Sequence, residues 1–581
     1  MVFLQTIRAN WRINLLLGFF GACLLVMIGR LIQVQVIQHD EFAAKANAQQ
    51  SRKFEIAAKR GEIFVSDNGE KYPLALNQRL SYVFADPKFI TEPAKVASQL
   101  SPLVGRSSEE LTPLLTFTGS RYVILRERVS DENVTKIKDL KIPGIVLRPK
   151  DYRYYTEGNL FSQVLGYVNN DGEGQYGLEQ YYNQELTGQN GQLKAVTDSL
   201  GVPIYGSDNT QVAPQDGSSV VLTIDRSIQS ISRKALETAV TQNKAESGSL
   251  VVMDPKTGSI KAMVNYPDYD PNNYGSVKSE DYRVFSNAAV SDLFEPGSIF
   301  KPIAMSAGID SGKVKADTKY TDTGEVTVSG KTIRNSENRK LGVQSMVDVI
   351  QQSLNTGMVF VLMSMGGDTS KVTKAGKELL YSYIQKYGFG KTTGIEQAGE
   401  ATSKVRDPST YDVDYASMMF GQGITVSVIQ MMQAVSAIAN GGKLYQPHLV
   451  AQTIDREGNV TDVKPKVIND KVISSQSAAV VASMMVQVVQ KGSGFATRMK
   501  GYNIAGKTGT ASVPKADGSG YETNKNIGSF IGFAPVEDPK FVMMVRINYP
   551  KVDGFAERTA VPAFATVAKE LFKYYQIPPS S

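Results

Sequence analysis

A serine and a lysine three residues apart carry the clearest chemical signal in the sequence. Ser298 and Lys301 stand in EPGSIFKP, directly after a Pro-Gly pair. Side chains three residues apart project from the same face of a helix, so the Lys301 amine can lie within hydrogen-bond reach of the Ser298 hydroxyl. A desolvated, neutral lysine can then accept the serine proton and make the serine a nucleophile. The pair therefore predicts acyl-transfer chemistry.

Pro302 indicates where the helix that carries this pair begins. Proline lacks an N–H group and is tolerated in the first turn of a helix, where that donor has no partner. We therefore expect the helix to start no earlier than Ser298, which places the hydroxyl at a helix N-terminus. Exposed amides and the helix dipole stabilise developing negative charge at such a position.

The sequence contains two Lys-Thr-Gly motifs, and either could contribute to the same site as Ser298 and Lys301. Lys507, Thr508, Gly509 and Thr510 lie in IAGKTGTASV, whose β-branched and small residues predict a strand. A glycine in that strand leaves room for a ligand backbone along its edge. The other copy, at 256–258, follows Asp-Pro and separates two apolar runs, which predicts a hairpin loop.

Three Ser-x-Asn motifs begin at Ser207, Ser336 and Ser353. The first two lie in polar stretches rich in Gly, Asp or Asn, which predict loops. The third follows a capped helix signature at 345–350. Positions two apart do not share a helix face, so Ser353 and Asn355 can both point into one site only if the helix breaks between them. The Asn-Thr-Gly sequence that starts at Asn355 predicts that break.

Three of these motifs stand in a chain order that resembles the active-site set of the penicillin-binding proteins and serine β-lactamases. In order they are Ser298-x-x-Lys301, Ser353-x-Asn355 and Lys507-Thr508-Gly509. Later stretches such as GFGKTTGIE and NIGSFIGFAPVEDP also resemble the transpeptidase domain of this family. One departure is Ile299, where the family usually has threonine, and we expect it to face away from the lysine.

The N-terminal half resembles the pedestal module of the class B penicillin-binding proteins, with the division type favoured. The resemblance lies at residues 60–63, Arg153, Gly166 with Tyr167, and 177–179. We assign these residues to folding and partner docking, with no catalytic role.

The resemblance implies an α+β multidomain fold. Its expected parts are a cytoplasmic tail over 1–12, a transmembrane anchor over 13–37, an elongated mixed α/β pedestal of the dimerisation type over 38–215, and a transpeptidase domain over 216–581. The transpeptidase domain would have the serine β-lactamase architecture, an antiparallel sheet flanked by helices. Residues 38–52 are expected to continue the anchor as a helix.

The activity implied by the resemblance is that of a peptidoglycan D,D-transpeptidase. Ser298, deprotonated by Lys301, would attack the carbonyl between the two terminal D-alanines of a stem peptide and release D-alanine. An amine from a neighbouring stem would resolve the acyl-enzyme. A β-lactam would mimic the donor stem and trap Ser298.

The resemblance also gives the remaining motif residues their roles. Ser353 would relay protons between the two lysines, and Asn355 would hold the stem amide. The substrate-binding residues would be Thr508, Gly509 and Thr510, with Lys507 helping to fix the terminal carboxylate. Backbone amides of Ser298 and Thr510 would form the oxyanion hole.

Composition narrows the classes of function. The chain has 581 residues, 42% of them hydrophobic, which suffices for several cores. A net charge of +6 is mild, and no basic run indicates nucleic-acid binding. Two histidines, His39 and His448, and a single cysteine, Cys23, argue against a Ser-His triad and a histidine-rich zinc site. We therefore expect an enzyme that needs no metal or cofactor.

Residues 13–29 form the targeting signal of the sequence. Their length reaches the lower limit of a membrane span, and Arg30 can snorkel to the interface and lengthen it. Trp11 lies where an aromatic anchor is expected. A cleaved signal peptide is the alternative, although its apolar region is usually shorter. The resemblance, rather than the flanking charges, implies a cytoplasmic N-terminus and an extracytoplasmic catalytic domain at the plasma (inner) membrane.

The expected partners are stem peptides, β-lactams, the membrane, and other wall-synthesis or division proteins. The region before the catalytic domain has no histidine-bearing Glu-Asp motif of the glycosyltransferase module. Glycan polymerisation is therefore expected from a multi-pass membrane polymerase of the SEDS type. Three alternatives stay open: a D,D-carboxypeptidase, a β-lactam-hydrolysing or sensing protein of the same fold, and an inert scaffold for the polymerase.

Overall fold

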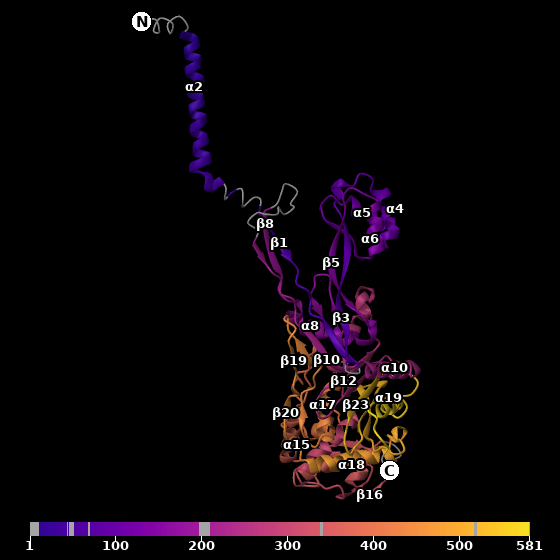
Figure 1. Ribbon diagram of the computed structural model, residues 1–581. Coiled ribbons are helices and arrows are strands. Elements are labelled where there is room, and N and C mark those ends of the chain that lie inside the picture. The colour runs from indigo at the N-terminus through magenta and orange to yellow at the C-terminus, as the bar shows by residue number, and fades with distance from the viewer. Residues whose placement is uncertain are drawn as a thin grey trace. The chain divides into compact units, whose positions relative to one another are not determined.

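The computed structural model describes residues 11–42, 45, 51–67, 70–196, 210–336, 341–515 and 520–579. The chain divides into two compact units, Met1–Lys59 with Gly188–Asp216, and Arg60–Thr187 with Gly217–Ser581 (Figure 1). The Ser-x-Asn motif at Ser207 lies outside the described residues, and so does the rest of the motif that begins at Ser336.

Helix α2 (Trp11–Ile32) is the apolar segment near the N-terminus. With the helical turn that follows, it covers Trp11–Ile37, 27 residues that include an 18-residue window with a mean hydropathy of 2.3. That length and hydropathy suffice to cross a membrane. No residue of α2 is buried within the protein, and an apolar helix exposed on every side is suited to a lipid surrounding.

The same unit holds a small antiparallel sheet. Its strands, in spatial order, are β1 (Ser51–Ile56), β8 (Gly191–Val196) and β9 (Thr210–Val212). Residues 39–42 are helical, but residues 51 and 52 lie in β1, so the predicted helix over 38–52 is wrong at its end. The pairing partner of β1 comes much later in the chain, and local sequence carries no signal for such a contact.

A five-stranded antiparallel sheet forms the centre of the larger unit. In spatial order its strands are β12 (Ile260–Tyr266), β11 (Ser247–Met253), β23 (Phe541–Asn548), β22 (Tyr521–Ala534) and β21 (Ala505–Pro514). The strand predicted around Lys507 is thus β21, and it lies at an edge of the sheet. The predicted hairpin loop at 256–258 is confirmed, because it joins the paired strands β11 and β12.

Helices cover both faces of this sheet: α10 (Arg226–Gln242) and α19 (Ala560–Tyr574) pack on one face, and α17 (Val428–Ala439) packs on the other (Figure 1). Alternate residues of β11 face opposite sides: Leu250 and Val252 pack in the cluster that includes α10 and α19, whereas Val251 and Met253 pack in the larger cluster on the other side. This alternation follows from the two-residue period of a strand. The predicted antiparallel sheet flanked by helices is confirmed.

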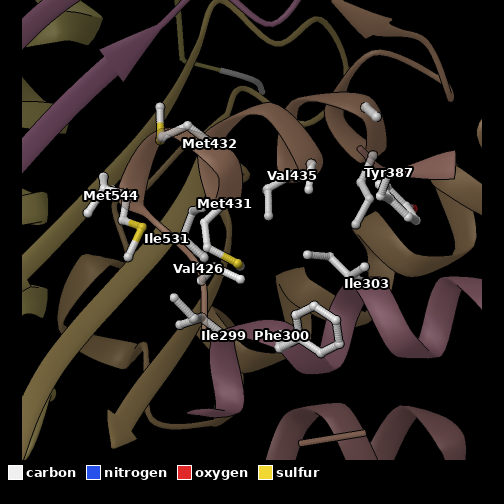
Figure 2. Packing of buried hydrophobic residues seen from close by; sticks show 14 of the residues in the cluster. Ile299, Phe300, Ile303, Tyr387, Val426, Met431, Met432, Val435, Ile531 and Met544 are labelled. Atoms are coloured by element: carbon white, nitrogen blue, oxygen red, sulfur yellow. The ribbon is translucent and has the colours of Figure 1, made fainter. Parts of the chain in front are cut away.

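The residues after Ser298 anchor the start of a helix in the larger hydrophobic cluster. Ile299 and Phe300 are fully buried. Figure 2 shows Ile299 near Val426 and Met431, and Ile531 of β22 belongs to the same cluster. Close packing of this kind leaves little room for the backbone next to Ser298 to move.

A second sheet has the order β19-β18-β10-β2-β3-β4, with β19 at Val460–Asp462, β3 at Glu70–Ala85 and β4 at Val123–Val129, and β5 (Ile145–Tyr155) also pairs with β3. In it, β10 (Ser219–Asp225) pairs in parallel with β2 (Ile63–Asp67) and antiparallel with β18 (Val450–Ile454). The sheet therefore contains strands from both sides of the predicted boundary at 215/216. The limits of the four predicted parts of the chain stay predictions.

A buried ion-pair network holds the segment between Arg60 and Thr187 together. Glu179 is fully buried and accepts from Arg60 Nε at 2.7 Å and from Arg153 Nε at 2.6 Å. Burial alone raises the pKa of Glu179, but the two guanidinium groups outweigh it and hold that pKa below its ordinary value. Arg60 and Arg153, to which the sequence analysis gave a role in folding, thus both pair with the Glu179 carboxylate.

Replacing Glu179 by glutamine should destabilise the protein by about 3–5 kcal/mol, because it leaves two guanidinium groups buried without their counter-charge. The lowered pKa means that this stability is present above the unfolded-state pKa and is lost as the pH falls through the folded-state pKa. Denaturant unfolding at neutral and acidic pH should show a difference between wild type and Glu179→Gln that shrinks in acid. A matched change at the exposed Glu132–Lys136 pair should have little effect, and an equal loss from both changes would contradict this account.

Candidate active site

Ser298 lies in a single turn of 3-10 helix, Gly297–Phe300, that runs directly into α12 (Lys301–Asp310). Side chains three residues apart are eclipsed in a 3-10 helix, so the side chains of Ser298 and Lys301 leave the same side of this turn. Pro302 falls in the first turn of α12, which confirms the predicted helix start. Ser298 is partly exposed although the residues on either side of it are buried. Ser298 therefore keeps some access to solvent on a backbone whose neighbouring residues are buried.

Ser353 occupies the break between two helices. Helix α13 (Met346–Gln352) ends at Ser353, which has φ 60° and ψ 44°, and α14 (Asn355–Met365) begins at Asn355. The predicted break between these two residues is confirmed. A left-handed conformation costs a non-glycine residue about 1 kcal/mol. This backbone conformation directs the Ser353 side chain to Lys301 Nζ, which Asn355 also contacts.

Two buried lysines meet at the Ser353 hydroxyl. Lys301 and Lys507 have no solvent exposure. Lys301 Nζ donates to Ser353 Oγ at 3.1 Å, to the Ser353 carbonyl at 2.6 Å and to Asn355 Oδ1 at 2.8 Å. Lys507 Nζ donates to Ser353 Oγ at 3.0 Å and to the Thr508 carbonyl at 3.0 Å. Three segments that are distant in sequence therefore share one hydroxyl.

Strand β21 packs against the turn that carries Ser298. A Cβ added at Gly509 would lie 3.0 Å from Ile299 Cγ2 and 3.1 Å from the Pro296 carbonyl oxygen. Only a residue without a side chain fits this approach without displacing its neighbours. Gly509 thus brings the Lys507 strand next to Ser298, in addition to the expected room for a substrate.

The two threonines of β21 have different surroundings. Thr508 is buried, and its hydroxyl lies 2.5 Å from Ser493 Oγ. Thr510 is exposed, and its Oγ1 accepts from the Ala556 amide at 3.3 Å. Ser493 was not predicted from the sequence, and no motif marks it.

Asn335 is a second residue that the sequence did not indicate. Its Oδ1 accepts from the amides of Asn355 at 2.7 Å and Thr356 at 3.1 Å, which caps the start of α14. The polar run NSENRK, which begins at Asn335, predicts only a loop. Its first residue fixes Asn355 in place for the contact with Lys301.

Glu295 fixes the backbone just before the Ser298 turn and was also missed. Its carboxylate accepts from the Gly423 amide at 2.8 Å and from the Tyr521 hydroxyl at 3.1 Å. Burial raises the pKa of Glu295, and the two donors oppose that rise. Burial and the nearby carboxylate raise the pKa of Tyr521 to about 12.

In the part of the chain that the structure describes, no group of three His, Cys, Asp or Glu side chains is placed to hold a metal ion.

Comparison with known proteins gives two family matches. Residues 248–572 match the penicillin binding protein transpeptidase domain, and residues 55–222 match the penicillin-binding protein dimerisation domain. Together they cover the catalytic sheet, its motifs and the segment before them.

Individual relatives are similar over nearly the whole chain. Stage V sporulation protein D of Bacillus subtilis is 34% identical over 559 residues, 95% of this chain and 84% of the relative. Peptidoglycan D,D-transpeptidase FtsI of Escherichia coli K12 is 28% identical over 98% of this chain and 93% of its own length. A crystal structure of penicillin binding protein 3 from Mycobacterium tuberculosis, complexed with ampicillin, has a TM-score of 0.69 and 25% identity, covering 91% of this chain and 97% of that one.

The left-handed backbone at Ser353 predicts that two small replacements differ in their effect on stability. Ser353→Gly and Ser353→Ala both remove the hydroxyl, but only glycine tolerates the backbone conformation without strain. The glycine variant should be more stable than the alanine variant by about 1 kcal/mol in denaturant unfolding. Ser329, a serine with φ 46° outside the site, is the matched control and should show the same order. Equal stabilities at both positions would contradict the strain.

Proposed function

The chain belongs to the class B penicillin-binding proteins and is a peptidoglycan D,D-transpeptidase, and we propose that it acts through an acyl-enzyme formed on Ser298. One observation carries the proposal: the Ser353 hydroxyl lies between two buried lysines, beside the turn that presents Ser298. A hydroxyl can accept from one of these amines while it donates to the other. Two protonated amines at such close range repel each other, which favours one neutral amine, and the proposal assigns the neutral form to Lys301.

In the proposed first step, Ser298 Oγ attacks the carbonyl carbon of the penultimate D-alanine while its proton passes to Lys301 Nζ. The bond to the terminal D-alanine nitrogen then breaks. That nitrogen takes up a proton, D-alanine leaves, and the acyl ester stays on Ser298. The eclipsed positions of Ser298 and Lys301 support this direct transfer.

In the proposed second step, the amine of a neighbouring stem peptide attacks the ester. The amine loses a proton, a new amide forms, and Ser298 Oγ regains its proton. Ser353 can relay protons between the lysines, because its Oγ lies 3.1 Å from Lys301 Nζ and 3.0 Å from Lys507 Nζ. Asn355, held by Asn335, would orient the stem amide.

The same proposal assigns substrate binding to the edge strand β21. Lys507 with Thr508, Gly509 and Thr510 would fix the terminal carboxylate of the donor stem. The amides of Ser298 and Thr510 would stabilise the oxyanion, at about 3 kcal/mol for each donor in comparable acyl-transfer enzymes. The exposure of Thr510 and the position of β21 at the edge of the sheet support access for a peptide.

The proposal extends to location, organisation and partners. The N-terminal apolar helix would anchor the chain in the plasma (inner) membrane, with residues 1–12 in the cytoplasm and the catalytic domain outside. The pedestal over 38–215 and the transpeptidase domain over 216–581 would work with a SEDS-type polymerase and other wall-synthesis or division proteins. The family matches at 55–222 and 248–572 support this division of the chain. The ampicillin complex of the mycobacterial relative supports β-lactams as ligands.

Incubation with benzylpenicillin should add one penicilloyl group to the purified protein, and peptide mapping by mass spectrometry should locate it on Ser298. The adduct should persist for minutes or longer, because the chain combines the transpeptidase and dimerisation domains of the penicillin-binding proteins, and a relative of this organisation is a transpeptidase rather than an enzyme that hydrolyses β-lactams. Ser298→Ala should show no adduct while keeping the cooperative unfolding of the wild type. An adduct on another residue, or none on the wild type, would defeat the proposal.

The two Lys-Thr-Gly copies provide a matched test of the substrate-binding strand. Lys507→Ala should lower the second-order rate constant of penicillin acylation by about 100-fold, the effect of losing a buried charge-assisted contact of about 3 kcal/mol. Lys256→Ala should leave this rate constant unchanged, because Lys256 lies on the hairpin between β11 and β12, where it is exposed and pairs with Asp538. Stopped-flow or gel-based assays measure the acylation rate constants of both variants. Similar losses in the two variants would contradict a role of Lys507 in substrate binding.

A further inference from the structure

A buried carboxylate that has no part in the proposed chemistry lies next to the start of α14. Asp322, the last residue of β13 (Lys319–Asp322), is 2% exposed. Its Oδ1 accepts from Thr356 Oγ1 at 2.9 Å and from the Gly324 amide at 2.9 Å, and its Oδ2 accepts from Asn335 Nδ2 at 2.8 Å. These donors are all neutral groups. Burying a carboxylate is costly unless donors satisfy it, so the arrangement depends on each of them.

Asn335 connects this carboxylate to the active site. Its Nδ2 donates to Asp322, and its Oδ1 accepts from the amides of Asn355 and Thr356. Asn355 Oδ1 in turn accepts from Lys301 Nζ at 2.8 Å. A continuous series of contacts thus leads from Asp322, through the side-chain amide of Asn335, to the residue that contacts Lys301.

The direction of the hydrogen bonds is fixed on both sides of Asn335. An ionised carboxylate can only accept, and a backbone N–H group can only donate. The Asn335 carboxamide satisfies both neighbours only when Nδ2 faces Asp322 and Oδ1 faces the start of α14. A carboxamide rotated by half a turn would bring donors together at α14 and acceptors together at Asp322. Asp322 therefore determines how the Asn335 side chain is oriented.

We propose that Asp322 is a positioning residue of the transpeptidase site: its acceptor-only carboxylate sets the orientation of Asn335, which in turn holds Asn355 for Lys301 and the substrate amide. The inference rests on the function proposed above and adds a residue that lies in none of the active-site motifs. A helix start whose amides lose their acceptor is weakened. Loss of the orientation should therefore displace Asn355 and leave every reacting group in the protein.

Asp322→Asn keeps the shape of the side chain and replaces one acceptor by a donor. In either orientation of the new carboxamide, its NH₂ group faces another N–H group, that of Gly324 or that of Asn335. We expect the second-order rate constant of benzylpenicillin acylation to fall by about tenfold, because a buried donor then lacks its acceptor. Amide hydrogen exchange in the peptide that begins α14 should become faster.

An exchange of the two side chains tests the orientation directly. Asn335→Asp alone places two carboxylates next to each other and should also slow acylation. In the double variant, Asp322→Asn with Asn335→Asp, the carboxylate lies next to the α14 amides and the carboxamide donates to it. Each donor then has an acceptor again. The double variant should therefore lose less than either single variant, both in acylation rate and in the protection of α14 from exchange.

Tyr320→Phe is the matched control. The Tyr320 hydroxyl lies 3.0 Å from Thr356 Oγ1, so its removal takes a hydrogen bond from the same cluster and leaves the contact between Asp322 and Asn335 intact. This variant should be less stable than wild type but should be acylated at the wild-type rate. All rates are compared at a temperature at which cooperative unfolding shows each variant to be folded. If Asp322→Asn does not fold, Asn335→Ala removes the connection to α14 and should slow acylation similarly.

Three results would overturn the inference: a wild-type acylation rate in folded Asp322→Asn, or in folded Asn335→Ala where that variant takes its place; a double variant as impaired as the worse single variant; and an equal loss of rate in Tyr320→Phe. Failure of the proposed function is distinguishable, because wild type itself would then lack the adduct on Ser298. Hydrogen exchange tests the inference in that case as well, since equal exchange of the α14 peptide in wild type and Asp322→Asn would contradict it.

Discussion

The hydroxyl of Ser353, shared by two lysines that have no contact with solvent, is the interaction on which the rest of the site depends. Holding two amines at one oxygen costs free energy, since each brings charge or polarity into a dry interior. That cost is sustained only if the three contributing segments are fixed independently. A different local feature positions each segment. Ser298 lies in a 3-10 turn before α12, Ser353 is a left-handed residue between α13 and α14, and β21 has a glycine where it comes closest to the Ser298 turn.

Packing away from the site supplies this rigidity. Ile299 and Phe300 lie in the large hydrophobic cluster, so they fix the backbone next to Ser298, while Ser298 itself stays partly exposed. Glu295 ties the preceding residues to Gly423. Because the sheet is buried on both faces, a shift of any one strand would disturb a close-packed core. The active site is thus a surface feature of a rigid interior, as expected where reacting groups must keep a fixed geometry.

The sequence was informative wherever a local rule applied. Proline marked the start of α12, the spacing of Ser353 and Asn355 required a helix break, and flanking residues separated the strand copy of Lys-Thr-Gly from the loop copy. Contacts between distant segments were not predictable in this way. Asn335 and Ser493 reach the site through tertiary packing, and β1 forms only because β8 pairs with it. No local propensity or motif encodes such partners, because their effect depends on the folded arrangement.

A double-mutant cycle on penicillin acylation tests the shared hydroxyl most directly. The second-order rate constants of wild type, Ser353→Ala, Lys507→Ala and the double variant give the coupling between the two side chains. If Ser353 and Lys507 act as one unit, the double variant should lose about as much as the worse single variant. Losses that simply multiply would show that the two residues act independently, and would contradict the central role of the Ser353 hydroxyl.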